Sequence, residues 1–241
     1  MRIGKLQDYV AASSNIVFFG GAGVSTESGI PDFRSVDGLY NQQWKYPPEV
    51  MISHSFFESH TSDFYDFYRN KLLHLNAQPN KAHLALAALE KAGKLKSVIT
   101  QNIDGLHQKA GSINVIELHG SVWRNFCIGC RAVYEVDAIV NAAGVPLCSC
   151  GGVIRPDIVL YEETLDDGLM AAAVKHIAGA DMLIIGGTSL GVYPAAGLLR
   201  YFGGSKLVLI NKTATHMDEV ADLVIRESIG EALASALSSW A

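Results

Sequence analysis

No apolar run in this 241-residue sequence reaches the roughly 18 to 20 residues that a helix needs to cross a bilayer. The apolar stretch at 16–19 is short, follows Asp8 and several polar residues, and precedes a glycine-rich loop. It therefore does not have the form of a cleavable leader. We expect a cytoplasmic protein that has no membrane partner.

Clusters of basic residues are also missing. Lys and Arg total 19 against 24 Asp and Glu, which gives a net charge of -5, and the basic residues are scattered singly along the chain. Because binding to nucleic acid depends on a concentrated positive patch, we expect no nucleic-acid partner. Hydrophobic residues make up 49% of the sequence, which is enough for a sizeable buried core.

The glycine-rich loop lacks the rest of a dehydrogenase fingerprint. Gly20, Gly21 and Gly23 would let the backbone approach a pyrophosphate at the start of a helix. The third glycine of that fingerprint is replaced by Thr26, and no acidic residue ends a second strand about 20 residues later. A conventional dehydrogenase is disfavoured, while a turn that binds nothing stays open for this motif alone.

Short apolar runs separated by helical patterns predict an α/β fold. We expect buried strands at 16–19, 98–100, 115–118, 182–185, 207–210 and 223–225. Helices are predicted from Asn80 to about Lys91, at about 163–179 and at 230–240. Strands that alternate with helices in this way indicate a Rossmann-like, doubly wound parallel sheet.

Two stretches interrupt this alternation. Residues 31–78 contain many of the aromatic side chains and suggest loops with short helices, whereas residues 120–156 contain every cysteine. We expect both to form a smaller helical and zinc-binding insert domain. The Rossmann-like part would then comprise about 1–30, 79–119 and 157–241.

The four cysteines are arranged as two close pairs, C-x2-C and C-x-C, with 17 residues between them. Two such turns can present four thiolates tetrahedrally, and a closed set of four is typical of one structural zinc ion. Disulfides or redox-active thiols are the alternatives, and the lack of an export signal disfavours disulfides. The predicted ligands are Cys127, Cys130, Cys148 and Cys150.

Polar residues follow the predicted strands where these end. Gln101, Asn102 and Asp104 follow one strand, His119 follows the next, and Asn211 follows a later one. Turn chemistry or a structural histidine explains each residue singly. Open α/β sheets bind ligands at this edge, however, and a histidine there has a pKa suited to a general base. We therefore expect one binding crevice.

Taken together, the motifs "GAGVSTESGIPDFRS", "TQNIDGLHQKAG", "ELHG", "GTSLGVYPAA" and "LIN", with the cysteine quartet, resemble the sirtuin family of NAD-dependent protein deacylases. The match covers essentially the whole chain, so residues 1–241 look like a single catalytic domain of the compact bacterial type.

The resemblance implies a site residue by residue. NAD would be the co-substrate, with Phe33 covering its nicotinamide side and Arg34 ordering the loop. The implied catalytic residues are His119, Asn102 and Asp104. The implied NAD contacts are Gly21, Ala22, Gly23, Ser25, Phe33, Arg34, Gln101, Asn102, Ile103, Asp104, Gly187, Thr188, Ser189, Asn211 and Ile229.

The resemblance also implies the chemistry. The acyl oxygen of an acetylated lysine attacks the nicotinamide ribose, nicotinamide leaves, and His119 then acts as general base on a ribose hydroxyl. The acetyl group ends on ADP-ribose. Two alternatives use the same cofactor site: transfer of ADP-ribose to a protein, and a module that binds NAD and zinc without catalysis.

In the family, the segment "RPDIVLYEE" and the "GVYP" loop hold the acetylated protein substrate as an added strand. The implied peptide contacts are Val159, Leu160 and Val192. The sequence departs from the family at Glu162, where glycine is common. The Tyr and Arg pair of members that prefer acidic acyl groups is absent from "LYNQQWKYPPE", so an uncharged acyl group is favoured. No dimer patch is evident, which favours a monomer.

Overall fold

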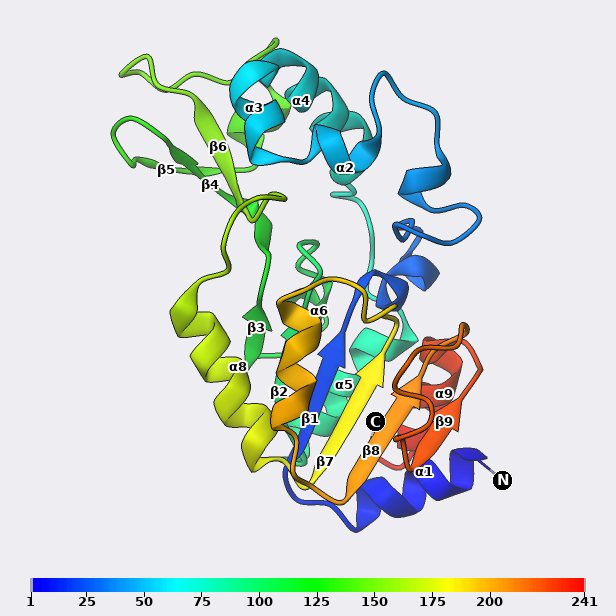
Figure 1. Ribbon diagram of the computed structural model, residues 1–241. Helices are drawn as coiled ribbons and strands as arrows, with labels where there is room; N and C mark the ends of the chain where they lie inside the picture. Colours follow the sequence, from blue (N-terminus) through cyan, green and yellow to red (C-terminus); the bar gives the residue numbers. More distant parts are fainter. Residues whose placement is uncertain (1, 241) are drawn as a thin grey trace.

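The computed structural model describes residues 2–240, and a six-stranded parallel sheet forms its larger part (Figure 1). The strand order is β3-β2-β1-β7-β8-β9. The strands are β1 (Ile16–Gly20), β2 (Leu95–Thr100), β3 (Val115–Glu117), β7 (Met182–Gly186), β8 (Lys206–Ile210) and β9 (Leu223–Ile225). The chain winds outward in one direction from β1 and in the other from β7. This reversal creates a switch point between β1 and β7, where such folds bind ligands.

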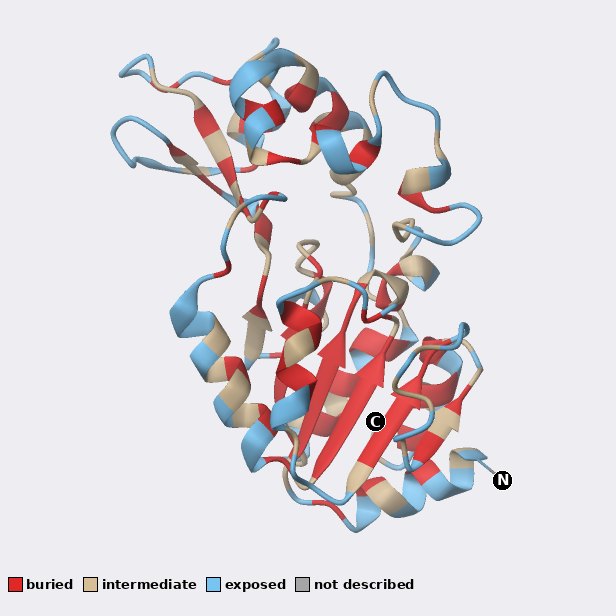
Figure 2. Cartoon of the chain, viewed as in Figure 1, coloured by how far each residue is buried: buried red, intermediate tan, exposed pale blue. Residues whose placement is uncertain are grey.

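The strands are buried because their apolar side chains point alternately to two covered faces. Phe18 packs on the face covered by α1 (Arg2–Ala11), α5 (Lys81–Lys91) and α9 (Ile229–Leu237). Phe19 packs on the opposite face, which α8 (Asp167–Gly179) and the 3-10 helix η5 (Ala195–Tyr201) cover. Figure 2 shows β1, β7 and β8 buried over most of their length. The doubly wound sheet predicted from the apolar runs is confirmed.

Local capping sets the helix boundaries. Asn80 accepts a hydrogen bond from the Ala82 amide at 2.9 Å, and α5 begins there as predicted. Helix α8 begins later than predicted, because Asp166 is its N-cap and accepts from the Leu169 amide at 2.8 Å. Glu163, the predicted start, lies outside the helix. Helix α9 ends before the predicted residue 240, and α1 was not predicted.

The glycine-rich loop does not lead into an α-helix. It continues as two 3-10 turns, η1 (Ala22–Val24) and η2 (Thr26–Ser28), which are followed by loop and by η3 (Leu39–Asn41). The short helix α6 (Leu106–Lys109) follows β2. The regular helix that follows the glycine loop in a dehydrogenase is therefore not formed, in agreement with the missing dehydrogenase fingerprint, and the short turn η1 begins there instead. Among residues 2–240, no helix combines the length and apolar character that crossing a membrane requires.

A smaller module lies beyond the carboxyl ends of the large sheet (Figure 1). Its antiparallel sheet has the order β5-β4-β6. Its elements are α2 (Pro48–Met51), α3 (His54–Ser59), α4 (Thr61–Phe67), the π-helix η4 (Tyr68–Leu72), β4 (Gly120–Cys127), β5 (Val133–Glu135), α7 (Asp137–Val140) and β6 (Ile154–Ile158). Aromatic side chains from the helices pack against β4 and β6 in one core. The module thus combines the two stretches that interrupt the strand–helix alternation, and its exact boundaries stay a prediction.

Candidate active site

The carboxyl ends of the central strands lie at one level. Gly20 of β1 pairs with Thr100 of β2 and with Gly186 of β7, and Gly186 pairs with Ile210 of β8. The loops that follow these four residues therefore leave the sheet side by side. They carry most of the predicted site residues, which the fold brings together at the switch point.

Two glycine loops pack directly against each other at this edge. The Gly23 amide donates to the Gly187 carbonyl at 2.7 Å, and the Gly21 amide donates to the Gly186 carbonyl at 3.2 Å. A Cβ atom on Gly23 would lie 2.8 Å from the Gly187 Cα, and one on Gly21 would lie 2.8 Å from the Thr188 Cβ. These glycines are required by the contact between loops, in addition to any approach of a phosphate.

A buried chain of polar side chains crosses the site. The Asn102 side-chain Nδ2 donates to Ser25 Oγ at 3.0 Å, and Ser25 Oγ donates to Asp104 Oδ2 at 2.6 Å. Asp104 Oδ1 accepts from the Leu106 amide at 2.9 Å. Because each side chain is held by its neighbour, their orientations are fixed before a ligand binds. Gln101 is held separately, since its Nε2 donates to Thr188 Oγ1 at 3.1 Å.

His119 is held in one tautomer. Its Nδ1 lies 2.9 Å from the Gln101 carbonyl oxygen. Because a carbonyl can only accept, Nδ1 carries the proton and Nε2 keeps a free lone pair. Burial lowers the pKa of His119 below its usual value, so the ring is neutral at pH 7. A neutral imidazole with a free Nε2 can act as a base.

The other predicted NAD contacts surround this centre. Arg34 Nη1 donates to Ser189 Oγ at 3.2 Å, which joins the 33–41 segment to the loop after β7. Phe33 is half-buried and packs against the Tyr40 ring. Asn211 is buried after β8, and its side chain donates to the Thr213 carbonyl at 3.0 Å.

Two predicted NAD contacts are turned partly into the protein. Ile229 belongs to the core, and a Cβ atom on Gly186 would collide with its Cδ1 atom. Ile103 packs against the core of the small module, and its carbonyl accepts from the Val122 amide at 3.0 Å. Their roles toward NAD stay predictions.

The 155–163 segment lies next to the predicted base. The Val159 amide donates to the His119 carbonyl at 3.0 Å, so the segment is anchored beside His119. Val159 also lines a cavity of about 480 Å³ together with Leu118 and Ile158. Leu160 is buried in the small module, and its amide is bound to Glu163 Oε2 at 2.8 Å. The segment can therefore offer Val159 to a substrate, while the Leu160 side chain supports it from behind.

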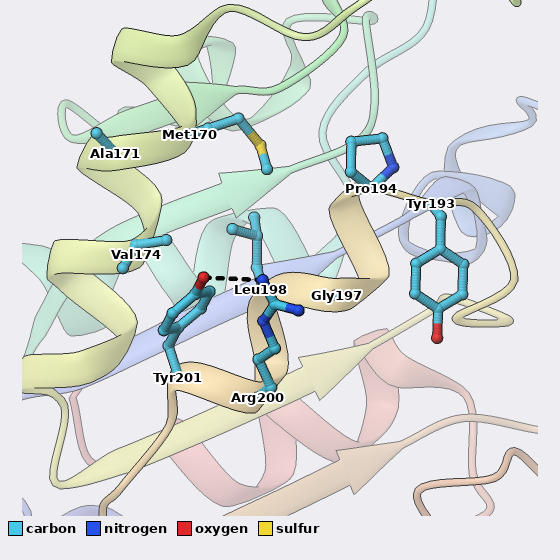
Figure 3. A pocket seen from close by; sticks show the side chains of 9 residues that line it. All are labelled: Met170, Ala171, Val174, Tyr193, Pro194, Gly197, Leu198, Arg200 and Tyr201. Carbon is cyan, nitrogen blue, oxygen red and sulfur yellow. Dashed lines mark hydrogen bonds between the residues drawn. The ribbon is translucent and has the colours of Figure 1, made fainter.

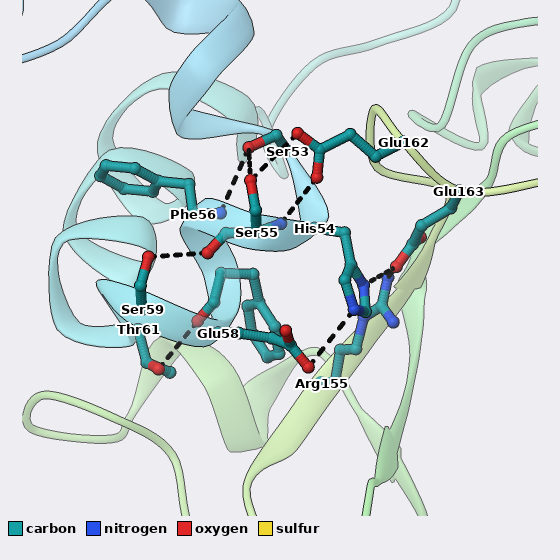
Figure 4. Close-up of polar contacts among 11 residues, drawn as sticks. Ser53, His54, Ser55, Phe56, Glu58, Ser59, Thr61, Arg155, Glu162 and Glu163 are labelled. Carbon is teal, nitrogen blue, oxygen red and sulfur yellow. Dashed lines mark hydrogen bonds and ion pairs between the residues drawn. The ribbon is translucent and has the colours of Figure 1, made fainter.

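Glu162 adopts a backbone conformation that favours glycine. Its φ is 75°, in the left-handed region, and its carboxylate accepts from the Ser55 amide at 2.9 Å and from Ser55 Oγ at 3.0 Å (Figure 4). The contact fixes the first turn of α3. The usual glycine at this position is thus explained by the backbone conformation, and the Glu162 side chain points toward α3.

The 187–194 loop borders a second groove. Val192 is half-buried in this loop, whereas the neighbouring Tyr193 is largely exposed. Tyr193 and Pro194 line a groove against α8 and η5 (Figure 3). The groove volume of about 270 Å³ lies below the roughly 300 to 1,000 Å³ of typical ligand pockets. It contains no predicted NAD contact.

Several residues of the site were not found from the sequence. Trp123 Nε1 donates to the Asp104 carbonyl at 2.9 Å, and Gly105 is required because a Cβ atom there would lie 2.8 Å from the Trp123 ring. His83 and His107 pack ring against ring behind the site. Burial lowers the pKa of His83 to about 4 and that of His107 to about 3, so both are neutral. Only the glycine after Asp104 could have indicated a close neighbour.

The four cysteines converge as predicted. Their sulfur atoms all lie within 4.8 Å of one another, and the nearest pairs are 3.4 Å and 3.6 Å apart. A disulfide would need about 2.05 Å, whereas four sulfurs around one zinc at about 2.3 Å lie about 3.8 Å apart. Gly152 leaves the necessary room, since a Cβ atom there would lie 2.7 Å from Cys127 Sγ. The donor set fits one structural zinc ion.

The known proteins that are similar to this chain in sequence all point to one family. The profile described as the Sir2 family matches residues 21–194. A Clostridium acetobutylicum protein named NAD-dependent protein deacetylase is 58% identical over 236 residues and covers 96% of both chains. A protein of the same name from Sulfurisphaera tokodaii is 43% identical over 241 residues, with 97% of this chain and 94% of the relative covered.

Solved structures agree with this result. A Sir2 structure with a deacetylated p53 peptide and 3'-O-acetyl ADP-ribose has a TM-score of 0.91 at 40% identity, over 99% of this chain and 98% of the other. A Sir2 complex with a p53 peptide and NAD+ has a TM-score of 0.88 at 40% identity, with the same coverage. Because the profile matches more than half of the chain and the relatives span nearly all of it, this protein belongs to the Sir2 family.

Proposed function

We propose that this protein is an NAD-dependent protein lysine deacetylase whose active site lies at the carboxyl edge of the large sheet. The observation that carries the proposal is His119, a neutral histidine with a free Nε2. Its Nδ1 bonds to the carbonyl of Gln101, the residue before Asn102, and its own carbonyl accepts from the Val159 amide, so it contacts both the loop after β2 and the segment that contains Val159. A base between a cofactor site and a peptide site suits a reaction that joins the two ligands.

The residues at the switch point fit NAD. When bound, NAD would supply an electrophilic ribose carbon, with nicotinamide as the leaving group, and its ADP-ribose part would accept the acyl group. The Gly21, Gly23 and Gly187 amides already donate to carbonyls, so these glycines would bring the two loops close to the phosphates rather than bind them directly. Arg34 adds positive charge near Ser189. Asn102 and Asp104 offer a donor and acceptors to the ribose and carboxamide. These roles follow from the polar groups that the loops carry.

His119 moves the proton in the acyl-transfer step. Its Nε2 takes a proton from a ribose hydroxyl, while the Gln101 carbonyl stabilises the positive charge that forms on the ring through the Nδ1 proton. Burial keeps the base unprotonated at neutral pH. Phe33, on the loop over the site, excludes water from the nicotinamide side. The chain thus contributes a base, orientation and exclusion of solvent.

The substrate is a protein with an uncharged acyl-lysine, either acetyl or a longer aliphatic group. Val159 and Val192 offer apolar surface on the two sides of the peptide site. The aromatic residues of the 39–49 stretch support the small module: Tyr46 packs on Phe56, and Trp44 packs on Phe67. The cation of that stretch, Lys45, is paired with Asp63, so burial of an acidic acyl group would be costly.

The zinc site is structural, because all four ligands come from the protein and leave no open position. We further propose a cytoplasmic monomer. Four cysteines that can hold a metal and form no disulfide are consistent with a reducing compartment. The most exposed apolar side chains, such as Val36, Ile113 and Val133, are far apart in the sequence, which favours a monomer.

Mass spectrometry of products tests the proposed reaction. The protein is incubated with NAD and an acetyl-lysine peptide, and a parallel reaction without NAD serves as the control. We expect free lysine peptide, nicotinamide and O-acetyl-ADP-ribose in equal amounts, and none of them without NAD. ADP-ribosylated protein with an intact acetyl group would contradict the proposal, as would the absence of turnover with both acetyl and longer aliphatic peptides.

A further inference from the structure

Two tyrosine hydroxyls meet between the two halves of the active site. We call residues 32–41 the cofactor loop and residues 155–163 the substrate segment. Tyr40 Oη of the cofactor loop lies 2.5 Å from Tyr161 Oη of the substrate segment. Within the described residues 2–240, this is the one hydrogen bond that joins the two directly. Leu39 and Leu160 also belong to one apolar core, so the tyrosine pair is the polar and directional part of the contact between the two segments.

Tyr40 is firmly attached to the residue predicted to cover the nicotinamide side. Its amide donates to the Phe33 carbonyl at 2.9 Å, and the two rings pack edge to face with centroids 5.6 Å apart. The Arg34 guanidinium lies 5.6 Å from the centroid of the Tyr40 ring. Since Arg34 also donates to Ser189, Tyr40 belongs to the small group of side chains that sets the position of the cofactor loop.

The backbone of Tyr161 is fixed by hydrogen bonds on both sides. Its amide donates to the Ile52 carbonyl at 3.0 Å, and its carbonyl accepts from the His54 amide at 3.0 Å. The next residue, Glu162, binds the Ser55 amide, and Glu163 binds His54 and Arg155 (Figure 4). The substrate segment therefore holds the Tyr161 hydroxyl at a defined place, and a peptide bound beside Val159 would reduce its remaining movement.

We propose that Tyr40 and Tyr161 are positioning residues that couple acyl-peptide binding to the closure of the cofactor loop. The inference rests on the proposed function, because it takes Phe33 as the cover of the nicotinamide side and Val159 as a peptide contact. A peptide that steadies the substrate segment steadies Tyr161, and Tyr161 holds Tyr40 and Phe33 over NAD. Coupling of this kind is reciprocal, so NAD tightens peptide binding by the same factor.

The expected change in coupling between peptide and NAD binding follows from the strength of one neutral hydrogen bond. A neutral hydrogen bond between two side chains has a net effect equivalent to roughly a 2- to 12-fold change in an equilibrium constant. Loss of a contact that only supported the fold would weaken the binding of both ligands, but it would not change how one ligand affects the affinity for the other. A coupling contact instead changes the ratio of affinities, and the two hydroxyls act as one unit.

Calorimetric titration tests this pair. A carba-NAD analogue, which does not turn over, is titrated into wild-type protein with and without saturating acetyl-lysine peptide, and the ratio of the two dissociation constants is the coupling factor. The same ratio is measured for Tyr40→Phe, Tyr161→Phe and the double variant. Tyr201→Phe is the matched control, because its hydroxyl bonds only to the adjacent Arg200.

We expect the coupling factor to exceed one in the wild type and in Tyr201→Phe. Each single variant should reduce it roughly 2- to 12-fold, and the double variant should reduce it no further. In steady-state assays, KM for NAD should rise while kcat at saturation stays near the wild-type value. A wild-type ratio of one, unchanged ratios in the single variants, or additive losses in the double variant would overturn the proposal. A wild type that binds both ligands without deacetylation would instead contradict the proposed function.

Discussion

In the large sheet, β1 and β7 are buried at every residue, whereas in the small sheet β4 mixes buried with exposed residues and β5 is largely exposed. The large sheet is therefore specified by apolar side chains that follow one another along the chain. The small module depends on contacts between distant segments, namely the aromatic core shared by its helices and strands and the four sulfurs from two turns. One region is stabilised by apolar burial, and the other needs a metal in addition.

Removal of the metal should destabilise the small module far more than the large sheet, and this is the largest effect that we expect. In Cys130→Ala or after chelation, we expect the small module to lose protection from hydrogen exchange while β1, β7 and β8 stay protected. Structural zinc contributes on the order of 10 kcal/mol to such sites, and activity should fall with it because the substrate segment begins in β6 of the module. Ser149→Ala, beside two ligands, is the control. A fully active and folded metal-free protein would contradict a structural role for zinc.

A cavity in the large sheet should destabilise that sheet and leave the zinc module largely intact. Ile184 in β7 is fully buried, and Ile184→Ala should destabilise the protein by about 2 to 5 kcal/mol, the usual cost of such a truncation. Urea unfolding measures the free energy, and zinc content measures the module. We expect a lower free energy of unfolding, while the molecules that remain folded still contain one zinc ion each. Loss of zinc at conditions where the large sheet is folded would show that the two regions are not separable.

Glu162 stabilises the small module by hydrogen bonds to Ser55 rather than by apolar burial or a metal, so its effect should be smaller. Glu162→Ala loses the contacts to Ser55 but keeps the left-handed conformation, so we expect a loss of about 1 kcal/mol, as for a helix cap. Glu162→Gly loses the same contacts but removes a strain of roughly 1 to 2 kcal/mol. Glycine should therefore be more stable than alanine in urea unfolding. Equal stabilities would show that the conformation at this residue carries no strain.

The pH dependence of catalysis should follow the protonation of His119. A base must be unprotonated, so kcat/KM should rise with pH through the pKa of His119 and level off above it. Burial lowers this pKa, and the midpoint of the rise should lie below the usual value of 6.5. The measurement is kcat/KM for an acetyl-lysine peptide across the acid range. A midpoint above that value would contradict a buried, neutral base.

The comparison also explains what the sequence could predict. Each strand of the large sheet was located within a few residues, because an unbroken apolar run leaves few alternatives to a strand buried on both faces. The cysteine spacing was equally informative, since ligands of one metal are restricted in geometry. The convergence of Gln101, Asn102, Asp104 and His119 followed from the common level of parallel strand ends.

The remaining features depend on contacts between distant residues. The bond between Tyr40 and Tyr161 joins residues that are 121 positions apart, and neither neighbourhood indicates the other. The antiparallel sheet was not predicted, because the polar residues of β4 and β5 give no apolar run. The departure at Glu162 was visible, but its cause was a backbone angle, which one sequence does not indicate.

Replacement of His119 is the most direct test of the central claim that this residue is the base of a deacetylase. In His119→Ala, nicotinamide and free lysine peptide are quantified in the same reaction, with the α8 variant His176→Ala as the control. We predict that free lysine forms on the order of 10² to 10⁴ times more slowly, while NAD still binds and nicotinamide release exceeds deacetylation. Free lysine formed at close to the wild-type rate would contradict the account.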